Sequence, residues 1–73
     1  MTSDTKPQAI GLLARACGAE LALQVCRSHA GFYLGTRTTD GEPYTRESAE
    51  YWPTRERAEI ARKLGAWTQR RHL

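Results

Sequence analysis

The stretch LALQVCRSHAGFYLGTRT, residues 21–38, decides the fold of this chain. Leu21, Leu23 and Val25 occupy every second position of its first part, which is the period of a half-buried strand. Its last part, residues 32–38, is rich in aromatic and β-branched side chains, which favour strands. The sequence between them, Ser-His-Ala-Gly, is typical of a turn. The stretch therefore predicts an antiparallel β-hairpin.

The loop length of this hairpin fixes which side chains share a face. With a two-residue loop, Val25 lies opposite Leu34, and Leu23 lies opposite Thr36. The apolar side chains then share one face: Leu21, Leu23, Val25, Phe32 and Leu34. The other face carries Cys26, Tyr33, Gly35 and Arg37. We expect the apolar face to be covered and the Tyr33 face to meet solvent or a partner.

A second turn and a third strand are expected after this hairpin. Residues 39–42, Thr-Asp-Gly-Glu, give the clearest turn signal, because Asp-Gly readily adopts the positive φ angles of a tight hairpin. The third strand should run from about Tyr44 toward residues 51–52. Its register stays open, because Pro43 lacks an amide and a shift of one residue would move Tyr44 and Arg46 to the opposite face.

A helix is expected before the first hairpin. One helical stripe carries four residues at positions i, i+3, i+4 and i+7: Ile10, Leu13, Ala14 and Cys17. Asp4 or Thr5 can cap its start, Pro7 suits its first turn, and Gly18 suits its end. Gly11 lies inside this helix and weakens it by up to about 1 kcal/mol relative to alanine. Packing of the stripe must therefore stabilise the helix.

A second helix is expected after Pro53. Thr54 is a natural N-cap, and Arg62 and Lys63 come late, where the helix dipole favours cations. Its apolar stripe is formed by Ile60, Leu64 and Trp67, with Ala58 and Ala61 beside it. Glu59 and Lys63 are spaced for an ion pair along the helix.

The expected fold is α+β, in the order α-β-β-β-α, with a three-stranded antiparallel sheet and both helices on one of its faces. The 73 residues allow one domain, residues 1–73, with a flexible lead at residues 1–6 and a basic tail at residues 68–73. A domain of this size buries only about 60% of its unfolded surface. A flat or shallow binding surface is therefore expected in preference to a deep active site.

Membrane, metal and catalytic functions find little support in the sequence. No apolar run reaches the ~20 residues that cross a bilayer, and the N-terminus is polar, so we expect a cytoplasmic protein. Cys17, Cys26 and His29 lack the spacing of a zinc site, so no metal or cofactor is expected. No nucleophile comes with both an aligned base and an oxyanion site, so no enzymatic activity is expected.

Charge is distributed unevenly along the chain, whose formal net charge is +3. Residues 54–73 hold six cations and two acids, a net charge of +4, whereas residues 38–53 hold one cation and four acids, a net charge of −3. Nine of the eleven cations are arginines, which favour forked contacts to phosphate or carboxylate. An acidic hairpin is thus followed by a basic tail, a polarity that can orient a charged partner.

Two groups of residues are candidate binding sites. Aromatic and arginine side chains on the open sheet face offer stacking and forked hydrogen bonds, and the cations of the C-terminal segment can neutralise phosphates. The predicted binding residues are Tyr33, Arg37, Tyr44, Arg46, Trp52, Arg55, Arg62, Lys63, Arg70 and Arg71. Two plainer interpretations stay open: Trp52 and a tyrosine complete the core, and the basic helix face serves solubility.

These patterns predict a small non-enzymatic module that binds nucleic acid. The alternative is a small protein-binding adaptor or inhibitor, of the type that phages and mobile elements direct against a host protein complex. This alternative makes better use of the acidic side chains, which would repel a phosphate backbone: Asp40, Glu42, Glu47 and Glu50. A homodimer is also left open, because small domains often gain stability from a second copy.

The order α-β-β-β-α in about seventy residues is similar to that of double-stranded-RNA-binding domains, as an order of elements. In those domains the second helix opens with clustered lysines that contact phosphates. The matching turn here reads Thr-Arg-Glu-Arg-Ala-Glu, residues 54–59, where Arg55 and Arg57 can serve and acids are interleaved. No family is assigned from this resemblance.

Overall fold

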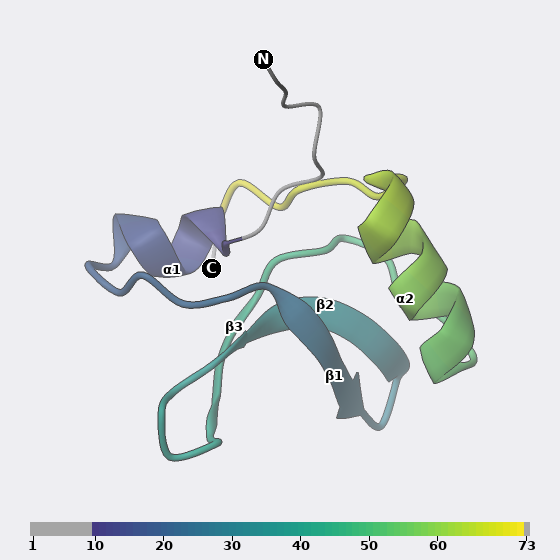
Figure 1. Ribbon diagram of the computed structural model, residues 1–73, viewed down its shortest axis with the longest axis horizontal. Helices are drawn as coiled ribbons and strands as arrows, with labels where there is room; N and C mark the ends of the chain where they lie inside the picture. Colours follow the sequence, from purple (N-terminus) through teal and green to yellow (C-terminus); the bar gives the residue numbers. More distant parts are fainter. Residues whose placement is uncertain (1–9, 73) are drawn as a thin grey trace.

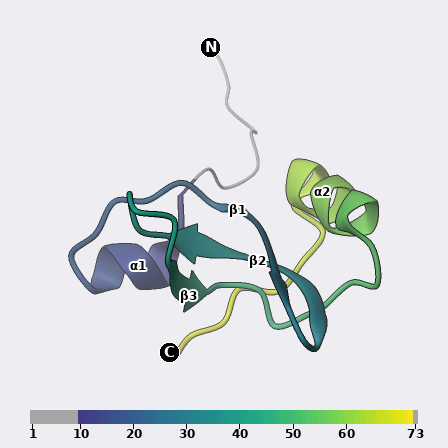
Figure 2. The same cartoon turned by 90° about the horizontal axis from the view of Figure 1, so that it is seen from below.

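The structure is a computed structural model that describes residues 10–72. Its elements are α1 (Leu12–Ala16), β1 (Gln24–Ser28), β2 (Gly31–Arg37), β3 (Pro43–Arg46) and α2 (Arg55–Leu64). The strands form one antiparallel sheet in the order β1-β2-β3, with one helix before and one after them, which confirms the α+β prediction. In Figure 1, α2 packs on β1 and β2 while α1 packs against β3, and Figure 2 shows the same arrangement from below.

The first hairpin has the predicted register. Val25 pairs with Leu34, and Ser28 pairs with Gly31 across the His-Ala turn. β1 begins at Gln24 and not at Leu21, because the preceding residues pair with the N-terminal segment: Ala22 bridges to Ile10, and the Gly11 amide donates to the Leu21 carbonyl at 3.0 Å.

The core lies between this hairpin and α2. Leu23, Val25 and Leu34 of the predicted apolar face form one buried cluster with Ala58 of the helix. Leu21, which was assigned to the same face, is only partly buried and lies outside this cluster. Three partly buried aromatic residues close the edges of the core: Phe32, Trp52 and Trp67. The small Ala58 side chain lets the helix approach the sheet closely.

The N-cap of α2 was predicted correctly, but its buried face was not. The Arg57 amide donates to the Thr54 hydroxyl at 3.1 Å, and Gly65 ends the helix with a φ of 67°. Ala58 and Ala61 are the buried residues, whereas Ile60 is 56% exposed and Leu64 is 73% exposed. The aromatic rings fill the space beside the helix, so the helix rests on its alanines and turns its larger apolar side chains outward.

The ion pair of α2 also differs from the prediction. Glu59 contacts Arg62 at 2.9 Å, three residues away, and not Lys63. Lys63 is exposed. In the described part of the chain, no helix is both long and apolar enough to span a membrane.

The second hairpin turns where Asp-Gly was expected, and its register is now resolved. Gly41 adopts a φ of 87°, while Asp40 keeps a negative φ, so only one residue needs the left-handed region. Thr45 pairs with Thr36 and is buried. Tyr44 and Arg46, its neighbours on either side, therefore lie on the open face.

The third strand is shorter than predicted. β3 ends at Arg46, and the amides of Glu47 and Ser48 both donate to the Leu34 carbonyl, at 2.8 and 3.0 Å. Pairing resumes at Trp52, which exchanges backbone hydrogen bonds with Phe32 at 2.7 and 2.9 Å. Residues 47–51 therefore leave the regular strand ladder as a loop that stays hydrogen-bonded to Leu34, and Glu47 of this loop is buried.

Glu47 explains where α1 begins. The helix was expected from about Pro7, but it starts at Leu12 with Gly11 as N-cap and no side-chain bond from that cap. The Glu47 carboxylate instead accepts hydrogen bonds from the amides of Leu13 and Ala14, at 2.9 and 3.1 Å. The predicted caps Asp4 and Thr5 lie outside the described residues.

Gly11 is required where the chain passes this carboxylate. A Cβ at Gly11 would lie 2.5 Å from Glu47 Oε2 and would also collide with Thr36 Cγ2. Of the predicted apolar stripe, Leu13 and Ala14 are buried, Ile10 is half-buried in its bridge to Ala22, and Cys17 is exposed. The stripe is thus shorter than the sequence indicates.

The C-terminal segment is fixed to the loop at residues 47–51. The Ala49 amide donates to the Thr68 carbonyl at 2.9 Å, and the Arg70 amide donates to the Glu47 carbonyl at 2.7 Å. The Thr68 amide also donates to the Glu50 carboxylate, at 3.0 and 3.1 Å. The segment expected as a basic tail is therefore anchored as far as Arg70.

Candidate functional site

The open face of the sheet is partly filled by Tyr33. This residue was expected to be exposed, but it is only 8% exposed. A Cβ at Gly35 would lie 2.8 Å from Tyr33 Cε2, so the ring covers the hollow that the glycine leaves in β2. Tyr51 packs edge-on against the same ring, with centroids 5.9 Å apart and planes at 76°. The tyrosine thus completes the packing of this face and supports Tyr51.

On this face, the Tyr33 hydroxyl stays neutral and the Arg37 guanidinium stays charged. Burial, followed by the neighbouring Cys26 side chain, raises the pKa of Tyr33, which keeps its hydroxyl neutral. Interaction with Cys26 raises the pKa of Arg37, which stays a cation. Within the described part of the chain, the buried Nε of Arg37 has no hydrogen-bond partner.

Tyr44, Arg46 and Tyr51 are the side chains that this face presents to solvent. Tyr44 is 41% exposed and Tyr51 is 40% exposed. The Arg46 guanidinium lies 4.8 Å from the centroid of the Tyr51 ring, and its Nη1 donates to the Ser48 carbonyl at 2.9 Å. Arg46 therefore both orients Tyr51 and closes the loop after β3. The third strand was predicted to run toward this residue, but Tyr51 was not among the predicted binding residues.

A second cluster forms where α2 begins, on the other side of the sheet. The guanidinium carbons of Arg27 and Arg55 lie 5.7 and 5.4 Å from the centroid of the Phe32 ring. Among residues 10–72, the ion pair of Glu59 with Arg62 is the only one, so neither arginine is neutralised by a carboxylate. This is the Arg27–Arg55 cluster.

The end of the first hairpin extends this cluster. A depression of about 500 Å³ is lined by Arg27, Ser28 and His29. Arg55 is the first residue of α2, where the free amides of the helix give a positive end. The sequence prediction missed Arg27, although the predicted register already places it opposite Phe32.

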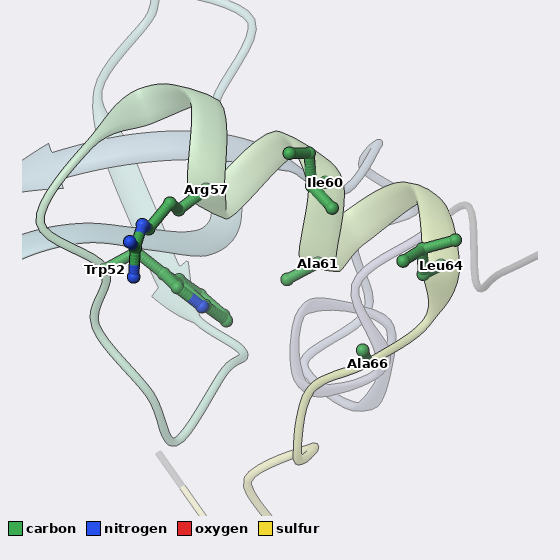
Figure 3. A pocket seen from close by; sticks show the side chains of 6 residues that line it. All are labelled: Trp52, Arg57, Ile60, Ala61, Leu64 and Ala66. Atoms are coloured by element: carbon green, nitrogen blue, oxygen red, sulfur yellow. The ribbon is translucent and has the colours of Figure 1, made fainter.

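The remaining predicted binding residues do not join one surface. Arg62 is paired with Glu59, and Arg70 Nη1 donates to the Arg46 carbonyl at 3.0 Å. Lys63 and Arg71 are exposed. Trp52 is half-buried and lines a groove beside α2, as Figure 3 shows.

Two of the four acidic side chains of the second hairpin face inward. Glu47 is fully buried; burial alone would raise its pKa, but hydrogen bonds from Thr45, Leu13, Gln69 and Ala14 lower it. Burial would also raise the pKa of Glu50, but hydrogen bonds from Thr68 outweigh this effect and lower the pKa. Both carboxylates therefore serve as internal acceptors.

Metal binding and similarity to known proteins give no further indication of a site. In residues 10–72, no group of three or more His, Cys, Asp and Glu side chains is placed to hold a metal ion. No family model, curated protein or solved structure matches this chain.

Proposed function

We propose that this chain is a non-enzymatic module that binds single-stranded nucleic acid, DNA or RNA. Arg27 and Arg55 contact phosphate groups on the α2 side of the sheet, and the exposed rings of Tyr44 and Tyr51 stack on bases on the opposite side. The bound strand therefore passes around an edge of the sheet. The observation that carries the proposal is the Arg27–Arg55 cluster: two guanidinium groups lie at one aromatic ring without an acidic partner.

Phosphate suits the Arg27–Arg55 cluster in both charge and geometry. Two cations at one aromatic ring make the local potential more positive, and this potential attracts an anion such as phosphate. A guanidinium offers forked hydrogen bonds that match phosphate oxygens, and the Phe32 ring restricts both side chains. The positive end of α2 at Arg55 adds to the attraction.

Base stacking suits the open sheet face. Stacking on aromatic side chains is worth about 1–3 kcal/mol per base and tolerates any base. Tyr51 contacts Tyr33 in a T-shaped pair, and the Arg46 guanidinium lies over its ring, so both groups are already ordered before binding. A base stacks on that guanidinium plane or on the part of the ring that stays exposed. Little side-chain entropy is lost when a base docks on an ordered ring.

The inward orientation of two acids favours this proposal over the host-protein alternative. Glu47 and Glu50 are occupied by internal hydrogen bonds, which leaves Asp40 and Glu42 as the exposed acids of the second hairpin. The repulsion of a phosphate backbone is therefore weaker than the sequence indicates, and the acidic surface offered to a basic protein is smaller.

The test is fluorescence anisotropy with labelled single-stranded DNA and RNA of about 16 nucleotides, the upper site size of comparable small domains. We expect micromolar binding that weakens steeply between about 50 and 200 mM salt. The Arg55→Ala protein should bind more weakly, with a salt slope lower by about 1 for the lost phosphate contact.

Arg15→Ala is the matched control. Arg15 is an exposed arginine of α1, so this variant removes the same charge away from the cluster. It should keep most of the affinity and the full salt slope. Equal losses in both variants would show that only net charge matters, and no binding to any probe at low salt would eliminate the proposed function.

A further inference from the structure

His29 lies at the tip of the first hairpin, beside the Arg27–Arg55 cluster. It belongs to the two-residue loop between β1 and β2, because Ser28 pairs with Gly31 across this loop. The residue is exposed and lines the depression of about 500 Å³ together with Arg27 and Ser28. Figures 1 and 2 both show this loop at the end of the molecule where α2 begins. His29 therefore borders the surface on which phosphate is proposed to bind.

The loop carries His29 on a backbone that is fixed from two sides. The Ser28 hydroxyl accepts from the Ala30 amide and donates to the Gly31 carbonyl, each at 3.2 Å. A Cβ at Gly31 would lie 2.9 Å from the Trp52 carbonyl oxygen, so the end of the loop packs against the segment after β3. Because the Ser28 hydroxyl is used within the loop, His29 is the further side chain of this depression that can contact a ligand.

The charged and titratable groups of the elements around the loop are three arginines, two glutamates and a tyrosine. β1 contributes Arg27, and the first turn of α2, residues 55–57, contributes two arginines and one glutamate, all exposed. The segment after β3 contributes the phenol of Tyr51 and the carboxylate of Glu50, which accepts from an amide of the C-terminal segment. In the part of the chain that the structure describes, no carboxylate lies within ion-pair distance of His29. The imidazole therefore has cations beside it and no acid that neutralises it.

We propose that protonated His29 is a third phosphate-binding side chain of the Arg27–Arg55 cluster, so that the domain binds single-stranded nucleic acid more tightly as the pH falls. This inference rests on the proposed function. Histidine is the side chain whose charge ordinarily changes between about pH 5 and 8, whereas the phosphodiester groups of a strand stay anionic there. With the proton, the imidazole donates from both ring nitrogens and adds a positive charge. A phosphate beside it favours this form, so the complex takes up a proton that the free protein lacks.

Fluorescence anisotropy at about pH 7.5 and about pH 5.5 tests the inference. The probe is a strand of about 16 thymidines with hydroxyl ends, none of whose groups changes charge between these pH values, and its label has an emission that does not depend on pH. In about 0.1 M salt, the wild type should bind about fivefold to tenfold more tightly at the lower pH, and its salt slope should be steeper by about 0.7 to 1. Both changes are the contribution of one further phosphate contact.

Two variants of His29 separate its charge from its shape. His29→Gln cannot gain the charge, so it should bind at both pH values with the affinity that the wild type has at the higher one. His29→Lys carries its charge throughout, so it should bind at the higher pH about as tightly as the wild type does at the lower one.

His72→Gln is the matched control, because His72 is the other of the two histidines and is exposed. Arg70, two residues before it, donates to the carbonyl of Arg46 in β3, at the opposite edge of the sheet from β1. This variant should keep the full pH dependence of the wild type. Circular dichroism at both pH values verifies that each protein is folded.

The outcomes separate this inference from the proposed function. Equal wild-type affinity at both pH values, a pH dependence that persists in His29→Gln, or one that disappears in His72→Gln would overturn the role of His29 while leaving the proposed function intact. If no protein bound the strand at either pH, the proposed function would fall and the inference with it.

Discussion

The two helices of this domain are held in place by opposite means. α2 carries its own start and stop signals, Thr54 and Gly65, and rests on the sheet through small apolar side chains. α1 has no side-chain cap of its own and depends on the Glu47 carboxylate, which lies 33 residues beyond Ala14 in the sequence. A local signal positions one helix, and a distant buried acid positions the other.

The two helices also differ in which of their side chains remain free to contact a partner. The polar groups around α1 are used internally: the Glu47 carboxylate also accepts from Thr45 Oγ1 at 2.6 Å and from Gln69 Nε2 at 2.8 Å. α2, in contrast, leaves Arg55 and Leu64 exposed. We therefore expect substitutions beneath α1 to reduce stability and substitutions on the outer side of α2 to change binding.

Removing the Glu47 carboxylate should have the largest effect. Glu47→Ala leaves two α1 amides and the Thr45 hydroxyl without their acceptor, and the loss should be roughly 3 kcal/mol or more of unfolding free energy. Urea denaturation measures it. A loss below that of an ordinary surface substitution would show that α1 does not depend on this carboxylate.

Acid should remove part of the same contribution. The pKa of Glu47 is lowered in the folded protein, so the unfolded chain binds the proton more readily. The stabilisation is therefore complete above the ordinary carboxyl pKa and is lost as the pH falls through that range toward the lowered pKa. Urea melts at several pH values should show this decline.

Glu47→Gln serves as the comparison for the acid series. The variant cannot ionise at this position, so its stability should fall less on acidification than that of the wild type. The loss of stability in acid that comes from Glu50 should remain, because the pKa of Glu50 is lowered as well. An identical decline in both proteins would assign the acid sensitivity to other groups.

The cap of α2 should matter least. Thr54→Ala removes the acceptor for the Arg57 amide, and the expected loss is about 1 kcal/mol. Thr54→Ser keeps the hydroxyl and should retain most of the stability in the same denaturation experiment. If Thr54→Ala cost as much as Glu47→Ala, the proposed contrast between the two helices would be wrong.

The same contrast shows how far sequence reasoning reaches. The pairing of Val25 with Leu34 and the Thr54 cap rest on neighbouring residues, so alternation and capping rules predicted them. The start of α1 follows from Glu47, whose carboxylate accepts from Leu13, Ala14 and Gln69, all at least 22 residues away in the sequence. No local pattern distinguishes this acid from an exposed one.

Less of the candidate binding surfaces than of the fold could be predicted from the sequence. Alternation placed Tyr33 on the open face but could not show that its ring would fill the hollow at Gly35. The stripe of Ile60 and Leu64 looked like the core face of α2, because the close approach through Ala58 depends on the aromatic residues around it. The meeting of Arg27 and Arg55 depends on where α2 docks, which is a tertiary property.

The most direct test of the account is an amide NMR titration with a single-stranded oligonucleotide. Binding as proposed should shift the amides of residues 27–32, residues 44–51 and Arg55, while α1 stays unchanged. Shifts concentrated at Ile60 and Leu64, or no shifts at a ligand excess, would contradict the proposed nucleic-acid surface.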